Sequence, residues 1–231
     1  MGRVDRPGIQ GIRVLTAATE LSQFVRANST VAAPPLCPEV RLHLAAQLTP
    51  VWEVLERRSG GNEVPPPYWA CAWPGGQALA RHVLDNPKLV AGKRVLDFAS
   101  GGGIAAISAV LSGAAQVLAA DIDPIAVAAM RLNAALNGTK FAVTAEDLTQ
   151  RADQRWDVIL AGDVCYEYPM AEGVLAWLRG RFEDGALVLL ADPGRKYVPL
   201  RGVTSLATYS VPTTRDQEAG DARRTTVYRL S

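Results

Sequence analysis

A cluster of small residues near the middle of the chain separates two apolar segments. Arg94–Phe98 has the pattern of a buried strand, residues 99–103 read Ala-Ser-Gly-Gly-Gly, and a helical pattern begins at Ile104. Glycine lacks a Cβ atom, so a glycine-rich backbone can approach a ligand closely and adopt positive φ angles. Such a turn between a strand and a helix indicates a nucleotide-type crevice, although dinucleotide-binding proteins use it as well. The turn alone leaves the occupant of the crevice open.

Carboxylates at the ends of three successive predicted strands narrow the choice of occupant. Asp97 stands immediately before the turn, Asp121 lies 24 residues further on, and Asp147 follows the third strand. A carboxylate at Asp97 would repel a pyrophosphate but attract the ammonium and sulfonium groups of S-adenosylmethionine. Asp121 is placed to accept hydrogen bonds from ribose hydroxyls, and the Glu146-Asp147-Leu148 segment can meet the adenine amine. Any one of these acids could instead cap a helix, so the cofactor interpretation depends on the set.

A fourth predicted strand, Asp157–Ala161, ends in a further group of polar residues. Gly162, Asp163 and Tyr166 come soon after it, so Asp163 and Tyr166 are expected at the same crevice, close to the methyl group of the cofactor. The alternative interpretation makes Asp163 a helix cap and Tyr166 a packing residue. Cys165 is expected to be buried rather than nucleophilic, because no histidine stands near it in the sequence.

Three segments together resemble the seven-strand protein-lysine methyltransferases: Trp69–Gln77, the turn after Asp97, and Asp163-Val164-Cys165-Tyr166. That family carries a tryptophan before its first core helix and an Asp-x-x-Tyr motif after its fourth strand. The block Pro67–Pro87, with its Trp-Pro-Gly-Gly-Gln and Leu-Asp-Asn-Pro runs, is most similar to the branch that methylates the β subunit of the electron transfer flavoprotein. The resemblance covers roughly residues 40–231.

The resemblance implies a binding role for a defined set of residues. Trp73 should contact S-adenosylmethionine, and Asp97 and Gly101 should contact its methionine moiety. Asp121 should contact the ribose, and the Asp147-Leu148 turn should contact the adenine. The expected cofactor-binding residues are Trp73, Asp97, Ala99, Ser100, Gly101, Gly103, Asp121, Ile122, Asp147, Leu148 and Gly162.

The resemblance also implies the reaction. Asp163 and Tyr166 are the expected catalytic residues, which hold the target lysine while a methyl group passes to it from S-adenosylmethionine. The implied protein substrate is the β subunit of the electron transfer flavoprotein. Ala99 departs from the pattern of the wider superfamily, which often has glycine at this position, and the difference tightens the turn.

Other functions compete with this interpretation. The nearest is a methyltransferase for a ribosomal protein or a small-molecule amine, against which only the resemblance argues. A nicotinamide-dependent oxidoreductase would need a favourable pyrophosphate site, which Asp97 opposes. A binding or regulatory protein could keep the cofactor fold without catalysis, but the presence of both Asp163 and Tyr166 argues against that.

From about residue 75 onward, predicted strands and helices alternate. The last two strands, about Ser205–Val211 and Thr225–Leu230, have no convincing helix between them and should form an antiparallel hairpin. This order predicts an α/β fold, namely a doubly wound, mostly parallel seven-stranded sheet of the Rossmann-like methyltransferase type that ends in the hairpin. The other predicted strands are Arg94–Phe98, Gln116–Asp121, Lys140–Thr144, Asp157–Ala161 and Ala186–Ala191, and the helices are Gly76–Leu84, Ile104–Leu111, Ile125–Leu136 and Met170–Phe182.

The N-terminal third of the chain is less regular. It contains an expected helix at Ile12–Ala27, a proline-rich linker at Val31–Pro38 and a short strand at Val40–Leu44. Thr49-Pro50 should open another helix, because proline is tolerated in the first turn, and Gly60-Gly61 should end it. We therefore expect residues 1–66 to form an N-terminal extension with helices and a strand, and residues 67–231 to form the S-adenosylmethionine-dependent methyltransferase domain.

Composition argues against several classes of partner. The chain has 24 Lys and Arg against 23 Asp and Glu, which gives a net charge of +1. Such a balanced charge does not indicate binding to nucleic acid or to an anionic membrane. The three cysteines have no metal-ligand spacing, so no metal is expected, and they indicate free thiols in a reducing compartment. No apolar run is long enough to span a membrane. We expect a cytoplasmic protein that acts as a monomer on a protein substrate.

Overall fold

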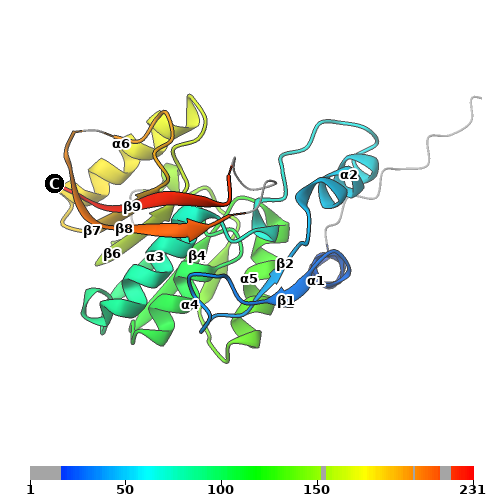
Figure 1. The fold of residues 1–231 in the computed structure, drawn as a ribbon, viewed down its shortest axis with the longest axis horizontal. Coiled ribbons are helices and arrows are strands. Elements are labelled where there is room, and N and C mark those ends of the chain that lie inside the picture. Colours follow the sequence, from blue (N-terminus) through cyan, green and yellow to red (C-terminus); the bar gives the residue numbers. More distant parts are fainter. Residues whose placement is uncertain (1–16, 152–154, 200, 214–219) are drawn as a thin grey trace, which may run out of the picture.

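The computed structural model describes residues 17–151, 155–199, 201–213 and 220–231, and seven of its strands form one sheet (Figure 1). These strands are β3 (Arg94–Phe98), β4 (Gln116–Ala120), β5 (Ala142–Thr144), β6 (Val158–Gly162), β7 (Leu187–Asp192), β8 (Val203–Pro212) and β9 (Ala222–Leu230). They lie in the order β5-β4-β3-β6-β7-β9-β8. The first five run parallel, and β9 is antiparallel to both of its neighbours. The predicted fold class, including the terminal hairpin, is confirmed.

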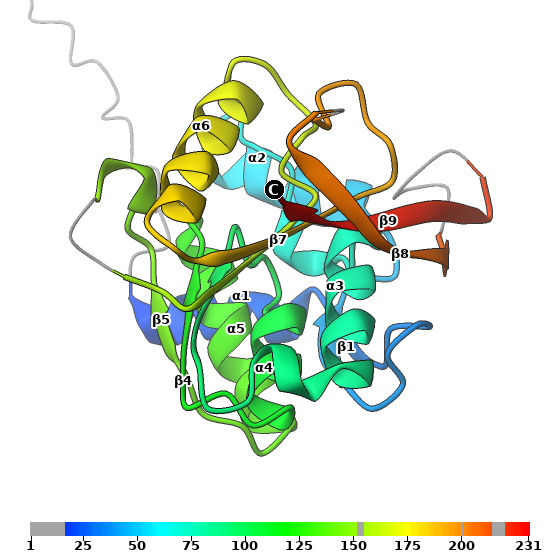
Figure 2. The ribbon, with the colours of Figure 1, turned by 90° about the vertical axis from the view of Figure 1, so that its left-hand side faces the viewer.

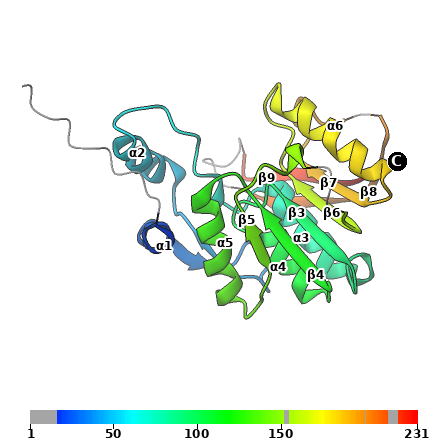
Figure 3. The ribbon, with the colours of Figure 1, turned by 180° about the vertical axis from the view of Figure 1, so that it is seen from behind.

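Helices cover both faces of the sheet because its central strands are apolar on both sides. Val95, Leu160 and Leu189 pack under α3 (Pro74–Asp85), α4 (Ile104–Leu111) and α5 (Pro124–Leu136). Leu96 and Leu190 point the opposite way, into the cluster beneath α6 (Met170–Glu183), as expected from the two-residue period of a strand. Figures 2 and 3 show α6 on one side of the sheet and α3–α5 on the other. None of the helices among the described residues is long and apolar enough to cross a membrane.

The strand order places the site. From β3 the chain moves outward through β4 to β5, and it then returns to the other side of β3 to form β6 and β7. Among its described residues, the connection from β5 to β6 contains the 3-10 turn Leu148–Gln150 and no α-helix. In open α/β sheets, ligands bind outside the carboxyl ends of the strands at such a change of direction. The ends of β3 to β6 are therefore the expected position of the cofactor.

The N-terminal extension differs in part from its prediction. The described part of the first helix, α1, spans Ala18–Ala27, and residues 12–16 lie outside the described residues. Thr30–Ala32, at the start of the predicted linker, forms strand β1 and pairs antiparallel with β2 (Leu42–Leu44). The sequence concealed β1 because all three of its side chains are exposed, so no apolar pattern marks it. Helix α2 spans Leu48–Arg58 and ends just before Gly60-Gly61, as predicted.

The extension packs its apolar residues against the sheet-bearing part of the chain. Leu21, Phe24 and Val25 of α1 form one cluster with buried alanines of α5 and with Trp69. The rings of Phe24 and Trp69 meet edge to face with centroids 6.4 Å apart. Arranged in this way, the extension shares a core with the rest of the protein, and the division at residue 66 stays a prediction about sequence organisation.

One buried side chain joins the extension to the glycine-rich turn. Asn133 of α5 is fully buried. Its Oδ1 accepts a hydrogen bond of 2.8 Å from the backbone N–H of His43 in β2, and its Nδ2 donates one of 2.8 Å to the carbonyl of Gly102. The position of the turn after β3 is thus fixed partly by residues some 60 positions earlier in the sequence.

Shortening Phe24 tests whether the extension and the sheet unfold together. Because Phe24 is 3% exposed and packs on Trp69, we expect Phe24→Ala to lower the free energy of unfolding of the whole protein by about 3–5 kcal/mol. Urea denaturation followed by tryptophan fluorescence and by circular dichroism measures it. Val31→Ala, at an exposed position of β1, should change stability by less than about 0.5 kcal/mol. If the main unfolding transition of Phe24→Ala occurred at the same urea concentration as in the wild type, the two parts of the chain would not share a core.

Candidate active site

A cavity of about 900 Å³ opens at the carboxyl ends of β3, β4, β5 and β6. Eleven of the thirteen residues predicted for the site line it: Trp73, Ala99, Ser100, Gly101, Asp121, Ile122, Asp147, Leu148, Gly162, Asp163 and Tyr166. The structure therefore brings together residues that four different strand ends contribute. The extension contributes to the wall as well, through Leu42, Pro65 and Pro66.

Asp97 and Gly103 are predicted contacts that lie outside the cavity lining. Asp97 is 3% exposed, and its Oδ2 accepts hydrogen bonds from the Ser100 hydroxyl (2.5 Å) and from the Ala106 N–H in the first turn of α4 (2.9 Å). Burial raises the pKa of Asp97 to about 7, although both hydrogen bonds oppose the rise. Gly103 has a φ of 85° where α4 begins, and its Cα faces Met130. Asp97 therefore holds Ser100 from the side away from the cavity, and Gly103 allows the turn to lead into α4.

The turn adopts a conformation that is uncommon for residues with a side chain. Ala99 has a φ of 53° and Gly101 also has a φ of 53°. A left-handed alanine is strained by roughly 1–2 kcal/mol, so the surrounding structure must hold it. Part of that support comes from the end of β4, where Asp121 Oδ2 accepts a hydrogen bond of 2.8 Å from the Gly101 N–H. Asp121 Oδ1 accepts another, of 3.0 Å, from the Asp123 N–H.

Apolar side chains line the part of the cavity between β4 and the 3-10 turn. Ile122 is 73% exposed at the rim, whereas Leu148 is 3% exposed. Phe98 and Trp177 stack deeper in the wall, with centroids 4.9 Å apart. Asp147 Oδ1 fixes the 3-10 turn by accepting hydrogen bonds from the Thr149 N–H (3.0 Å) and hydroxyl (2.6 Å). This end of the cavity suits a flat ring with a polar edge.

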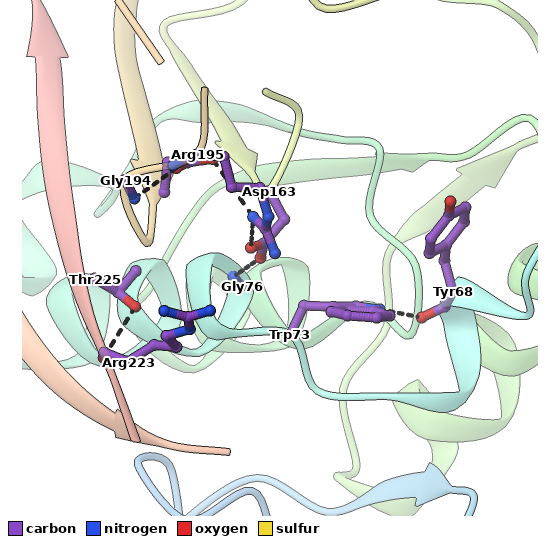
Figure 4. Close-up of polar contacts among 9 residues, drawn as sticks. Tyr68, Trp73, Gly76, Asp163, Gly194, Arg195, Arg223 and Thr225 are labelled. Atoms are coloured by element: carbon purple, nitrogen blue, oxygen red, sulfur yellow. Dashed lines mark hydrogen bonds and ion pairs between the residues drawn. The ribbon is translucent and has the colours of Figure 1, made fainter. Parts of the chain in front are cut away.

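The first turn of α3 approaches the end of β6 closely, because glycines stand on both sides (Figure 4). The Gly76 N–H donates a hydrogen bond of 2.9 Å to Asp163 Oδ2, and the Asp163 N–H donates one of 2.9 Å to the Ala191 carbonyl. A Cβ on Gly75 would lie 2.5 Å from the Ala191 oxygen, and one on Gly162 would lie 2.8 Å from the Gly76 nitrogen. The Trp-Pro-Gly-Gly run is thus the segment that allows α3 to start against the carboxylate of Asp163.

Asp163 also forms an ion pair that was not predicted. Nη1 of Arg195 lies 2.6 Å from Asp163 Oδ1 and 3.4 Å from Asp192 Oδ2. Asp163 has a φ of 60°, and burial raises the pKa of its carboxyl even though Arg195 and the Gly76 N–H lower it. The carboxylate that was predicted to hold a lysine is therefore already paired with an arginine in the structure. The signal in the sequence was Asp192-Pro-Gly-Arg195, another acid at a strand end followed by a turn.

Three aromatic rings meet on the other side of the cavity. The Trp73 indole N–H donates a hydrogen bond of 2.8 Å to the carbonyl of Tyr68. The ring of Tyr68 lies 5.9 Å from that of Trp73 and 5.4 Å from that of Tyr166, centroid to centroid. Burial, reinforced by the neighbouring Tyr68, raises the pKa of Tyr166, so its phenol stays protonated at neutral pH. Tyr68 was missed, since only its aromatic type after a proline run pointed to it.

The lining has a clear charge imbalance. Five carboxylates contribute to it, from Asp121, Asp123, Glu146, Asp147 and Asp163, whereas Arg195 is the one Lys or Arg among the described lining residues. Burial raises the pKa of Asp121, and that of Asp123 rises to about 6. A cationic ligand would relieve this repulsion, and a pyrophosphate would increase it.

Comparison with known proteins identifies the family to which the chain belongs. The model of the family "Ribosomal protein L11 methyltransferase (PrmA)" matches residues 78–164. The electron transfer flavoprotein beta subunit lysine methyltransferase of Xenopus laevis is 41% identical over 209 residues, which cover 88% of this chain and 84% of that protein. The protein of the same name from Mus musculus is 38% identical over 206 residues, covering 86% and 80%. The chain belongs to the electron transfer flavoprotein beta subunit lysine methyltransferase family.

The solved structures agree with this methyltransferase in fold. The 16S rRNA N2 G1207 methyltransferase of T. thermophilus, solved in complex with AdoMet and guanosine, superimposes with a TM-score of 0.54. The match covers 88% of this chain and 50% of that chain, and the sequences are 15% identical. At this identity the likeness concerns the fold alone. The family resemblance read from residues 67–87 and 163–166 is confirmed, whereas the roles of individual site residues stay predictions.

Gly75→Ala tests the close approach of α3 and β6 in this methyltransferase. The new Cβ would meet the Ala191 carbonyl and the Asp163 carboxylate within 2.6 Å, and the backbone there has little freedom to move. We expect a loss of about 1–3 kcal/mol in the free energy of unfolding, measured by urea denaturation. Gly180→Ala in α6, where a Cβ would meet nothing within 4 Å, should instead stabilise the helix by about 0.5–1 kcal/mol. Equal stability of the two variants would be incompatible with the packing described.

Proposed function

We propose that this protein is a protein-lysine N-methyltransferase that uses S-adenosylmethionine to methylate lysines of the electron transfer flavoprotein β subunit. The observation that carries the proposal is the cavity itself, in which a carboxylate-rich cofactor wall ends at Asp163 and Tyr166. The substrate follows from the names of the relatives that are 41% and 38% identical over most of their length. Three free, buried cysteines suit a reducing compartment, and we propose the cytoplasm.

The charge of the cavity supports S-adenosylmethionine as the cofactor. When bound, this molecule supplies a methyl group on a sulfonium centre, and its ammonium adds a second positive charge. Asp121 keeps unused acceptor capacity for ribose hydroxyls, because each of its oxygens accepts one backbone hydrogen bond in the structure. Gly101 and Ser100 line the same space. We assign the adenine to the walls formed by Ile122 and Leu148.

The lysine amine must be neutral before it can accept a methyl group. A free lysine has a pKa near 10.4, so deprotonation at about pH 7.4 costs roughly 4 kcal/mol. The nitrogen lone pair then forms the new N–C bond while the C–S bond breaks and leaves its electrons on sulfur. The reaction is an in-line displacement, so positioning supplies much of the rate. We assign that positioning to Asp163, which is held by Gly76 and Arg195, and to Tyr166.

The aromatic rings suit the lysine side chain. Tyr68, Trp73 and Tyr166 give an apolar surface for its methylene groups, and ring faces attract a substituted ammonium. The Tyr166 hydroxyl, protonated at neutral pH, can donate a hydrogen bond or accept one from the amine. These residues therefore can bind the substrate before and after transfer without a change of their own charge.

Calorimetric titration with S-adenosylmethionine and with NAD tests the cofactor. We expect the first to bind and the second to show no heat, because the carboxylates repel the pyrophosphate. Asp121→Asn should lose about 1.5–3 kcal/mol of binding free energy, roughly 10- to 100-fold in Kd. The matched control is Asp157→Asn, which removes an exposed carboxylate paired with Arg94 away from the cavity. Tight binding of NAD would overturn the cofactor assignment.

Asp163→Asn tests the site of transfer. We expect this variant to bind S-adenosylmethionine as the wild type does and to lose methylation of the purified β subunit by about 100-fold or more, because the amine is no longer positioned. The assay follows labelled methyl transfer, and mass spectrometry identifies the modified lysines. Asp157→Asn again serves as the control. Normal methylation by Asp163→Asn would show that the assigned role is wrong.

A second substrate is favoured by one specific observation. The family model that matches residues 78–164 is that of the ribosomal protein L11 methyltransferases. Ribosomal protein L11 therefore belongs in the same assay beside the β subunit. If L11 were methylated and the β subunit were not, L11 would replace the β subunit as the proposed substrate, and the cofactor assignment would be unaffected.

A further inference from the structure

We propose that Arg195 is a positioning residue that balances the charge of Asp163 and thereby disfavours the protonated form of the incoming lysine amine. The inference rests on the proposed function for its substrate, and on the structure for its geometry. Neither the resemblance nor the composition of the chain pointed to this residue. It lies in the loop between β7 and β8 and lines the cavity beside Asp163.

The guanidinium of Arg195 is fixed in place from two sides. Its Nη1 donates a hydrogen bond of 2.6 Å to Asp163 Oδ1 and a longer one of 3.4 Å to Asp192 Oδ2. The loop itself is held because Asp192 Oδ1 accepts hydrogen bonds from the N–H groups of Gly194 (2.7 Å) and Arg195 (2.6 Å). The Arg195 side chain is 18% exposed and that of Asp192 is fully buried. Figure 4 shows this loop bringing Arg195 onto Asp163.

Without Arg195, the carboxylate of Asp163 would oppose deprotonation of the lysine amine. A carboxylate close to a lysine stabilises its ammonium form, which has no lone pair for methyl transfer. A guanidinium within hydrogen-bonding distance of that carboxylate opposes the effect, and because Arg195 stays charged at every relevant pH, the opposition is permanent. Asp163, Asp192 and Arg195 together keep one negative charge. The site can thus attract a lysine side chain while it lowers the cost of removing the proton, which leaves to water.

The other groups around this pair do not replace Arg195. From β6 and its following loop, the Cys165 thiol is neutral, since burial raises its pKa to about 12, and Tyr166 is a protonated phenol. From α3, the Gly76 N–H offers only a partial charge to Asp163. From β9, which packs against α3, Figure 4 draws Arg223 without a dashed line to Asp163. Arg195 is the residue whose full charge is bonded directly to Asp163.

The first test measures the charge balance without any substrate. Carbon-13 NMR of labelled aspartate side chains follows the titration of Asp163 in the wild type, Arg195→Met and Arg195→Lys. We expect the pKa of Asp163 to rise by at least one unit in Arg195→Met and to stay near the wild-type value in Arg195→Lys. Arg94→Met, which breaks an exposed pair with Asp157 outside the cavity, should leave Asp163 unchanged. An unchanged Asp163 titration in Arg195→Met would overturn the proposal.

The second test measures the effect on turnover. The pH profile of kcat reports ionisations in the enzyme–substrate complex, and we expect its acidic limb to move upward by about one unit in Arg195→Met. Activity near pH 7 should then fall about tenfold and recover at alkaline pH, while Arg195→Lys should restore the wild-type limb. A loss that is equal at every pH would assign Arg195 a purely structural role and refute the inference. A wild type that methylates no β subunit would refute the proposed function instead, and the NMR titration would decide the role of Arg195 alone.

Discussion

The distance between the first turn of α3 and the end of β6 leaves no room for a methyl group on either side. Gly75 and Gly162 permit the contact, because a Cβ on either residue would clash with the facing segment, and a hydrogen bond from the Gly76 N–H to Asp163 secures it. Because α3 begins here, Trp73 is placed directly before it at the cavity wall. The same contact orients Asp163 toward the loop after β7. The cofactor wall, the aromatic rings and the ion pair are therefore arranged around one close approach of two backbones.

Backbone N–H groups support nearly all of the buried carboxylates. Asp97 accepts one from Ala106, Asp121 accepts one from Gly101, and Asp192 accepts two from its own loop. Each of these bonds favours the ionised form, whereas burial opposes it and raises the pKa of all three groups. The result is a set of acids that are held in fixed positions but incompletely stabilised. Of these three, Asp121 lines the cavity, so a positively charged ligand there would add to its stabilisation, which favours a sulfonium compound over a pyrophosphate.

The sequence predicted the sheet well because its central strands are unbroken apolar runs, such as Leu187–Ala191, with an acid or glycine at the end. Residues close to such strand ends were identified correctly as lining the cavity. Asp97 was predicted to touch the ligand, since nothing in the sequence reveals that the start of α4 and Ser100 would enclose its carboxylate. Arg195 and Tyr68 were missed because the sequence marks them only weakly, by a turn after an acidic strand end and by an aromatic residue after a proline run, whereas their importance arises from contacts between distant parts of the chain. Strand β1 was missed because a fully exposed three-residue strand leaves no pattern.

The side chain of Asn133, which bonds His43 on one side and Gly102 on the other, has a consequence for thermodynamic coupling. A ligand that binds more tightly when the turn is held in this conformation must, by linkage, also favour the arrangement of β2 that completes the pair of hydrogen bonds. The coupling works in both directions with the same free energy, so an event that loosens the extension also lowers the affinity for the ligand. The glycine-rich turn and strand β2 are in this way coupled to each other through one buried amide side chain.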